Sequence, residues 1–149
     1  MSQQLELFPA SDFCQRWNQR RSSWTHASAG GFDPRRFDVQ PIVEADARAY
    51  VVRHHYSGSY PAARMRYGLF CRSELVGVAV LSVPVRKEVL TAVFPRLEPY
   101  SESLELGRFV LADSVPGNGE SWFLGQMFKL AARDGLRGIV SFSDPQQRL

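Results

Sequence analysis

Apolar residues recur along this chain with the periods that predict five strands and two helices. Residues 37–43 alternate between apolar and polar side chains, which is typical of a half-buried strand. Residues 65–71 and 75–83 predict a hairpin joined by a turn at residues 72–74. The second hairpin strand is apolar on both faces, and this pattern favours a central position in the sheet.

Two segments have a helical period. Residues 44–55 carry acidic residues in the first turn and His54-His55 in the last, an arrangement that suits the helix dipole at both ends. Residues 120–134 are followed by Gly135, a typical C-terminal stop. The apolar stripe of this second helix predicts a buried face formed by Phe123, Leu124, Met127, Phe128 and Ala131.

The second helix belongs to a continuous unit that runs from Glu105 to Asp144. It comprises a strand, a glycine-rich turn at residues 117–119, the helix, and a last strand that begins at Gly138. Prolines punctuate residues 84–103 and predict an irregular segment before this unit. The order βα, ββ, βαβ predicts an α/β fold of the α+β type, a mixed sheet with helices on its faces.

The first 36 residues show no sustained period, and Gly30-Gly31 and Asp33-Pro34 interrupt them. We expect a mobile N-terminal tail over residues 1–36, with one short helix near residues 12–20. Residues 37–149 then form a single domain, which is the natural expectation for a chain of 149 residues.

Composition fits a soluble globular protein, with 44% hydrophobic and 22% charged residues. The sequence contains no apolar run of membrane-spanning length and no signal segment, so we expect a cytoplasmic protein. Cys14 and Cys71 lack metal-ligand spacing and are expected to be reduced thiols.

Arginine dominates the basic residues and is concentrated in the first half of the chain. Residues 1–72 hold ten Lys/Arg and six Asp/Glu, whereas residues 73–149 hold eight and nine. Arginines interspersed with Trp and Tyr suit a phosphate backbone with stackable bases. The alternative is an arginine-rich surface that only keeps the protein soluble.

The turn Gly117-Asn118-Gly119 lies between a strand and a helix start. Backbone N–H groups there, at the positive end of a helix dipole, suit a phosphate or pyrophosphate. The alternative is a surface turn in which Gly117 and Gly119 adopt positive φ. Neither a Walker lysine nor a G-x-G-x-x-G pattern is present, which disfavours nucleotide hydrolysis and dinucleotide binding.

Ionisable side chains stand at three element ends. The pair His54-His55 offers a general base or hydrogen-bond donor beside Tyr56, or it only compensates the helix dipole. Glu105 and Arg108 lie three apart on a strand, which predicts that they point to opposite faces.

Asp144 closes the last strand at its carboxyl edge, where open α/β sheets bind ligands. The alternative for this residue is an Asp-Pro turn, since Pro145 follows it.

A short motif at the N-terminus matches the Gln-Leu-x-Leu-Phe peptide that docks on the bacterial replication sliding clamp. Gln4, Leu5, Leu7 and Phe8 provide the four matching residues. Leu7 and Phe8 would fill an apolar pocket while Gln4 satisfies polar groups at a second one, and the tail would order on binding. The alternative is a chance string.

Three blocks together resemble the Mom-type DNA adenine modification proteins of phages and prophages, over roughly residues 38–149. They are His55–Ala62, Glu105–Phe109 and Ser141–Pro145. The resemblance implies a GCN5-related N-acetyltransferase fold, in which the strand, glycine turn and helix hold acetyl-CoA. It also implies conversion of adenine N6 in double-stranded DNA to a carbamoylmethyl derivative that protects phage DNA from restriction.

The resemblance implies site residues, a cofactor and a DNA surface. The cofactor is acetyl-CoA or a related acyl-CoA; iron is implied by the resemblance alone, and no ligand cluster in the sequence speaks for or against it. The residues implied as catalytic are His55, Tyr56, Arg108 and Asp144; as cofactor-binding, Phe109, Leu111, Gly117, Asn118, Gly119, Glu120 and Ser121; and as DNA-binding, Arg53, Tyr60, Arg64 and Arg66.

Relatives continue past the Ser-Asp-Pro block into further strands, whereas four residues follow Pro145 here. We therefore expect an acyltransferase-like domain over residues 37–149 without its last strands, or one completed by a separate C-terminal fragment. Two other functions stay open: an N-acetyltransferase acting on a small amine or peptide, and an inactive truncated remnant that binds the sliding clamp.

Overall fold

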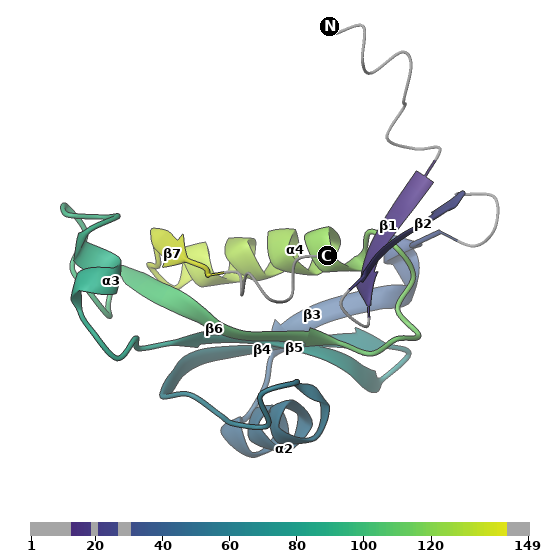
Figure 1. Ribbon diagram of the computed structural model, residues 1–149, viewed down its shortest axis with the longest axis horizontal. Coiled ribbons are helices and arrows are strands. Elements are labelled where there is room, and N and C mark those ends of the chain that lie inside the picture. The colour runs from purple at the N-terminus through teal and green to yellow at the C-terminus, as the bar shows by residue number, and fades with distance from the viewer. Residues whose placement is uncertain (1–12, 19–20, 27–30, 143–149) are drawn as a thin grey trace, which may run out of the picture.

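A five-stranded sheet with one helix on each face forms the body of the protein (Figure 1). The computed structural model describes residues 13–18, 21–26 and 31–142. The strands are antiparallel neighbours except β6 and β7, which are parallel, so the predicted mixed sheet is confirmed. In spatial order they are β3 (Phe37–Pro41), β4 (Ala63–Cys71), β5 (Glu74–Ser82), β6 (Ser103–Leu111) and β7 (Gly138–Val140).

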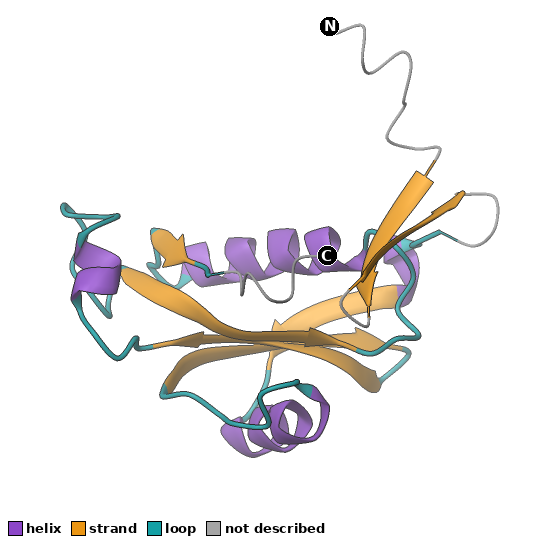
Figure 2. Ribbon diagram, in the orientation of Figure 1, coloured by secondary structure: helices purple, strands orange, loops and turns teal. Residues whose placement is uncertain are grey.

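The two long helices cover opposite faces of this sheet, α2 (Glu44–His54) on one side and α4 (Gly119–Arg133) on the other (Figure 2). Two short helical segments, η2 (Pro34–Arg36) and α3 (Glu88–Thr91), complete the described body. The short helix α3 lies in the segment predicted to be irregular. No helix in the described ranges is long and apolar enough to cross a membrane.

Strand β5 is central, as its doubly apolar pattern predicts, because both helices pack on it. Val78 and Val80 join the α2-side cluster, whereas Ala79 and Leu81 join the α4-side cluster. All four are fully buried. The alternation along this strand therefore supplies both halves of the core.

Helix α2 forms where the charges predicted it. Glu44 and Asp46 lie in its first turn, Arg53 and His54 in its last, and the backbone N–H of His55 closes it on Val51 O at 2.9 Å. The same Val51 is buried against the sheet, so the end of the helix, and hence His55, has a fixed position.

Helix α4 buries a narrower stripe than the sequence predicts. Phe123, Met127 and Ala131, each four residues apart, are buried, and Leu124 is partly so. Phe128 is 44% exposed, so its predicted burial is wrong. One residue beyond Met127 is about 100° further around the helix, which turns Phe128 away from the sheet. Gly135, with φ of 95°, ends the helix as predicted.

The helix expected near residues 12–20 is also wrong. Strands β1 (Phe13–Asn18) and β2 (Arg21–His26) pair there as an antiparallel hairpin, in a separate two-stranded sheet. The hairpin depends on pairing with a second segment, which the local pattern of the first one does not reveal. The clamp motif at residues 4–8 lies outside the described residues.

We predict that Phe123→Ala destabilises the protein by about 3–5 kcal/mol, because it removes a fully buried ring from the α4-side core. Phe128→Ala, five residues along the same helix, is the matched control and should cost less than about 1 kcal/mol. Urea unfolding of both variants measures the difference. Equal losses would contradict this assignment of the buried face.

Candidate functional site

Strands β6 and β7 pair over only three residues and then separate. Ser103, Leu104 and Glu105 pair with residues 138–140, and β6 continues to Leu111. Burial changes at the same place, from buried at residues 103–104 to half-buried at 105–111. In the described part of the chain no strand pairs with this edge of β6 over residues 106–110. Apart from the Gly107 carbonyl oxygen, which accepts from Arg108 Nη1, the backbone groups on this edge can pair with an extended ligand.

A bulge lies on β6 where this open edge begins. Leu106 pairs with Leu81 and Arg108 pairs with Val80, so Gly107 is one extra residue in the strand. A Cβ on Gly107 would overlap the Ser82 hydroxyl and press on Pro61. The bulge therefore requires glycine at this position.

The bulge reverses one prediction from the sequence. Glu105 lies opposite Ser82 and Arg108 opposite Val80, and these partners are two residues apart on β5. Glu105 and Arg108 therefore lie on the same face of the sheet, the face that α2 covers. The prediction of opposite faces is wrong because the extra residue shifts the alternation by one.

Arg108 ties β6 to the loop that follows α2. Its Nε donates to the Ser59 carbonyl oxygen at 3.0 Å, its Nη2 to Ser59 Oγ at 2.6 Å, and its Nη1 to the Gly107 carbonyl oxygen. Two of these bonds span 49 residues of sequence. The structure thus brings the first and second blocks of the sequence into one site, with Arg108 positioning the loop.

His55 lies at the base of this loop. Its Nδ1 is 2.8 Å from Ser57 Oγ and accepts the Ser57 backbone N–H at 3.2 Å. Burial, and secondarily the positive charge of Arg108, lower the pKa of His55 from 6.5 to about 4. The imidazole is therefore neutral near pH 7.

The adjacent residues His54 and Tyr56 differ from His55 in exposure. His54 is exposed, and its ring lies beside the Tyr50 ring with centroids 4.3 Å apart and planes tilted by 37°. The Tyr56 ring is 67% exposed and lies 4.3 Å from the His55 ring. An exposed aromatic face beside a neutral imidazole is suited to stacking against a planar ligand.

The four predicted DNA-binding residues differ in exposure, and two are exposed while two are half-buried. Arg53 and Arg64 are exposed. Arg66 is half-buried and donates its Nε to a backbone carbonyl oxygen at 3.4 Å. Tyr60 packs on the α2 side beneath the Arg48 guanidinium, 4.6 Å from its ring centroid. Burial is the main cause that raises the Tyr60 pKa.

The glycine turn leads from β6 into α4 on the opposite face of the sheet. The positive φ in this turn belongs to Asn118, at 71°, so the expectation of positive φ at Gly117 and Gly119 is wrong. Gly119 is needed for packing, because a Cβ there would overlap Val115. Ser121 Oγ donates to the Asn118 carbonyl oxygen at 3.2 Å.

Glu120 lies in the first turn of the 15-residue helix, beside the positive end of its dipole.

Phe109 and Leu111, the predicted cofactor residues on β6, direct their side chains into the α4-side core. The Phe109 ring lies 5.5 Å from Phe123. Any contact of these two residues with a cofactor would therefore use their backbone groups. The open edge of β6 then connects the glycine turn with the His55–Arg108 loop.

The resemblance implies iron without naming its ligands. The described residues contain no group of three His, Cys, Asp or Glu side chains that could hold a metal ion. Nδ1 of His55 is already occupied as an acceptor. Asp144 lies outside the described residues. Cys71 is a free, half-buried thiol.

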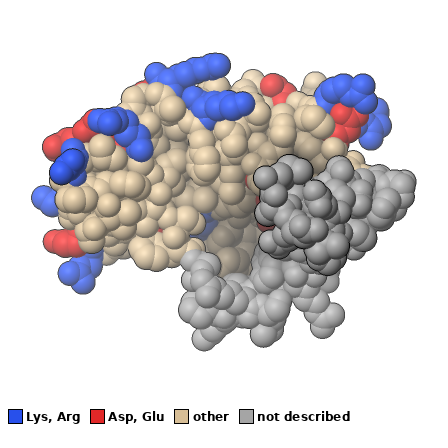
Figure 3. Space-filling view, turned by 90° about the horizontal axis from the view of Figure 1, so that it is seen from above, with Lys and Arg blue, Asp and Glu red and all other residues tan. Residues whose placement is uncertain are grey.

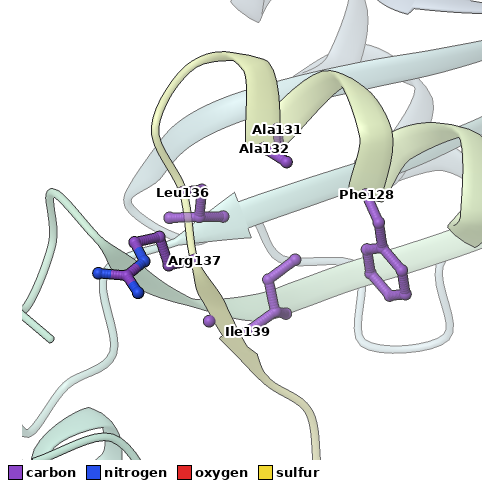
Figure 4. A pocket seen from close by; sticks show the side chains of 7 residues that line it. Phe128, Ala131, Ala132, Leu136, Arg137 and Ile139 are labelled. Carbon is purple, nitrogen blue, oxygen red and sulfur yellow. The ribbon is translucent and has the colours of Figure 1, made fainter. Parts of the chain in front are cut away.

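A hollow of about 330 Å³ lies between the C-terminal end of α4 and β7 (Figure 4). Its lining is mostly apolar and includes the exposed Phe128 and the half-buried Ile139. From the α4 side, Lys and Arg side chains stand mainly around the rim of the described surface, and its centre is uncharged (Figure 3). This hollow is separate from the His55 loop, which lies at the end of α2 on the other face.

Sequence reasoning did not assign roles to Ser57, Ser59 and Gly107. The two serines hold His55 and Arg108, and Gly107 forms the bulge. All three fall inside the blocks that carried the resemblance. The many hydroxyl side chains of the loop were a signal in the sequence for the two serines. The bulge leaves no such signal, because it is defined by the pairing of β6 with β5 and not by the pattern of β6 alone.

The chain is similar to known proteins in sequence and in structure over most of its length. Residues 36–148 match the Mom protein family. The aminoglycoside acetyltransferase meta-AAC0020 from an uncultured soil metagenomic sample, in complex with sisomicin, is similar in structure. Its TM-score is 0.52 at 9% identity, over 75% of this chain and 80% of that one.

A second aminoglycoside acetyltransferase, HMB0005, also from an uncultured soil metagenomic sample, gives a TM-score of 0.50 at 14% identity. The match covers 73% of this chain and 80% of that one. Curated protein sequences gave no significant match. The structural likeness confirms the predicted acetyltransferase-like fold.

We predict that Arg108→Met raises the His55 pKa above about 4. The rise should stop short of 6.5, because burial is the larger cause of the shift. An NMR pH titration of the His55 ring measures it, with Arg64→Met as a control that removes an exposed arginine. An unchanged His55 pKa in the Arg108→Met protein would contradict the assigned contact.

The same shift predicts a pH dependence of stability. Between pH 6.5 and about 4 the unfolded chain protonates His55 and the folded protein does not. The folded state therefore loses stability as the pH falls through this window. His55→Gln lacks this contribution, so wild type should lose more unfolding free energy than the variant between pH 7 and pH 4.5. Parallel losses in urea unfolding would argue against a neutral folded-state His55.

Proposed function

We propose that this chain, which belongs to the Mom protein family, modifies the N6 amine of adenine in DNA with a carbamoylmethyl group. Such a modification would protect phage or prophage DNA from restriction enzymes. Family membership together with an acetyltransferase-like fold supports a transferase role. The observation that carries the proposal is the joining of His55 to Arg108 through the Ser57–Ser59 loop.

The open edge of β6 supports an acyl-CoA cofactor. A pantetheine-like arm would pair with backbone groups at residues 106–110, where no described strand competes. Its pyrophosphate would lie at the start of α4, beside Gly117-Asn118-Gly119. The Gly107 bulge would then hold the reactive end of the cofactor next to the loop that carries His55.

The α2 side of the sheet supports the DNA surface. Arg53 and Arg64 are exposed and would contact phosphates. A target adenine inside a duplex is out of reach of a site made from a helix end and a strand bulge, so it would be extruded. The exposed Tyr56 ring would stack on the extruded base.

In the proposed reaction adenine N6 attacks the methylene carbon of a carbamoylmethyl donor that carries a leaving group on this carbon. The N6–C bond forms as the bond to the leaving group breaks, the leaving group departs with the electron pair, and N6 loses one proton. Arg108 would position the loop rather than contact the base, since its guanidinium already donates three hydrogen bonds. Asp144, which the resemblance implies as catalytic, is proposed to handle the proton on the amine.

Two protein partners complete the proposal. The motif at residues 4–8 would bring the protein to the sliding clamp and hence to newly replicated DNA. A complementing C-terminal fragment would add to the edge of β7 opposite β6, where no strand in the described ranges pairs. It would also cover the apolar hollow lined by Phe128 and Ile139.

We predict that cells expressing the full chain, with any native downstream sequence, accumulate a modified deoxyadenosine. Mass spectrometry of hydrolysed DNA should show a mass increase that corresponds to a carbamoylmethyl group. Arg108→Ala should reduce it by about 100-fold, because losing the positioned loop misplaces the reactive groups. Arg96→Ala, an exposed arginine near α3, should leave it unchanged. Unmodified adenine in the wild-type culture would overturn the proposal.

A second candidate is N-acetylation of a small amine or peptide, favoured by the fold shared with two aminoglycoside acetyltransferases. Release of free thiol from acetyl-CoA, dependent on an added amine and indifferent to DNA, would select it over the first. An inactive chain that only binds the sliding clamp would show neither activity.

A further inference from the structure

The hydrogen bonds around His55 form a chain with a fixed direction. A guanidinium can only donate, so Arg108 Nη2 donates to Ser59 Oγ at 2.6 Å. Ser59 Oγ in turn donates to Ser57 Oγ at 3.4 Å. The Ser57 hydroxyl proton then points to His55 Nδ1, 2.8 Å away. Ser57 Oγ also accepts the Ser59 backbone N–H at 3.4 Å, so both of its lone pairs are used and its proton is left for Nδ1.

A second contact, from the Ser57 backbone, independently shows that His55 Nδ1 is an acceptor. The backbone N–H of Ser57 also donates to His55 Nδ1, at 3.2 Å, and a backbone amide has no alternative role. Nδ1 therefore carries a lone pair. In a neutral imidazole the single ring proton must then be on Nε2. The low pKa of His55 is consistent with the neutral ring.

This direction bears on what His55 can do in catalysis. To serve as a base through Nε2, the ring would need its proton on Nδ1, facing the Ser57 N–H and the end of the chain that starts at Arg108. Two donors would then face one another in a half-buried position, which costs free energy. No hydrogen bond between Nε2 and another described residue competes for its proton.

We propose that His55 is a hydrogen-bond donor, through Nε2–H, to an uncharged sp² acceptor of the bound substrates, and that Arg108, Ser59 and Ser57 together fix that proton. The acceptor is either the carbonyl oxygen of the transferred group or a ring nitrogen of adenine. As a donor, Nε2–H would polarise and orient the carbonyl group of the transferred group beside the reacting methylene carbon, or orient the base. The inference rests on the proposed function only for the identity of these substrates.

The tautomer is measurable without any activity. Long-range ¹⁵N–¹H NMR correlations of the full chain distinguish the two neutral tautomers of each histidine. Spectra of His54→Gln and His55→Gln assign the signals among the three histidines. At pH 7 His55 should show a protonated Nε2 and an unprotonated Nδ1. A proton on Nδ1, or a doubly protonated ring at that pH, would overturn the proposal.

The acceptor is identified by the shift of the Nε2 signal when probes are added. Acetyl-CoA is compared with coenzyme A, which lacks the carbonyl, and an adenine-containing duplex with its 7-deazaadenine counterpart. A shift with one probe that is absent with its matched analogue supports donation to that acceptor. No difference within either pair would overturn it.

Activity supplies a third measurement. The Gln amide retains an N–H near the position of Nε2 but cannot take up a proton, whereas Ala retains neither. We expect DNA modification by His55→Gln to stay within about 10-fold of wild type, and His55→Ala to lose about 100-fold or more. His54→Gln, at the exposed neighbour, should match wild type. Equal inactivity of the Gln and Ala variants would indicate a base instead. Unmodified wild-type DNA would reject the proposed function and leave the NMR result to decide the tautomer.

Discussion

The pair of hydrogen bonds from Arg108 to Ser59 is the contact on which the site depends. It joins a strand in the middle of the sheet to the loop after α2, across 49 residues of sequence. The loop is exposed, and β6 has no described strand beside residues 106–110, so these bonds join two segments that no other described strand pairing connects. The bulge at Gly107 is what turns Arg108 toward this loop.

The order and type of the main elements could be predicted because they depend on local patterns. Charges at both ends of α2, the stripe on α4 and the doubly apolar β5 were sufficient. The errors occur where contact with a second segment of the chain determines the structure. The β1–β2 hairpin requires its partner strand, and Phe128 differs from Met127 only by which side of α4 faces the sheet.

The structure brings three of the predicted site residues, His55, Tyr56 and Arg108, together around one loop, whereas their geometry could not be predicted. The Tyr56 ring lies beside the His55 ring, and Arg108 on β6 donates to the loop that follows these two residues. The relation of Glu105 to Arg108 could not be predicted, because one extra residue at Gly107 is invisible in the alternation. Gly119 shows the same limit: its lack of a side chain serves packing against Val115, whereas the turn's positive φ falls on Asn118.

A directional chain of hydrogen bonds explains why a histidine beside an arginine can be useful. The positive charge of Arg108 disfavours protonation of His55, and its N–H groups begin the chain that ends on Nδ1. Burial, with the first effect as the smaller cause, keeps the ring neutral, and the second effect selects which nitrogen carries the proton. Together they convert a residue that could serve as acid, base or ligand into one with a single exposed donor. The bulge that places Arg108 therefore controls the chemistry of His55 from the opposite side of the loop.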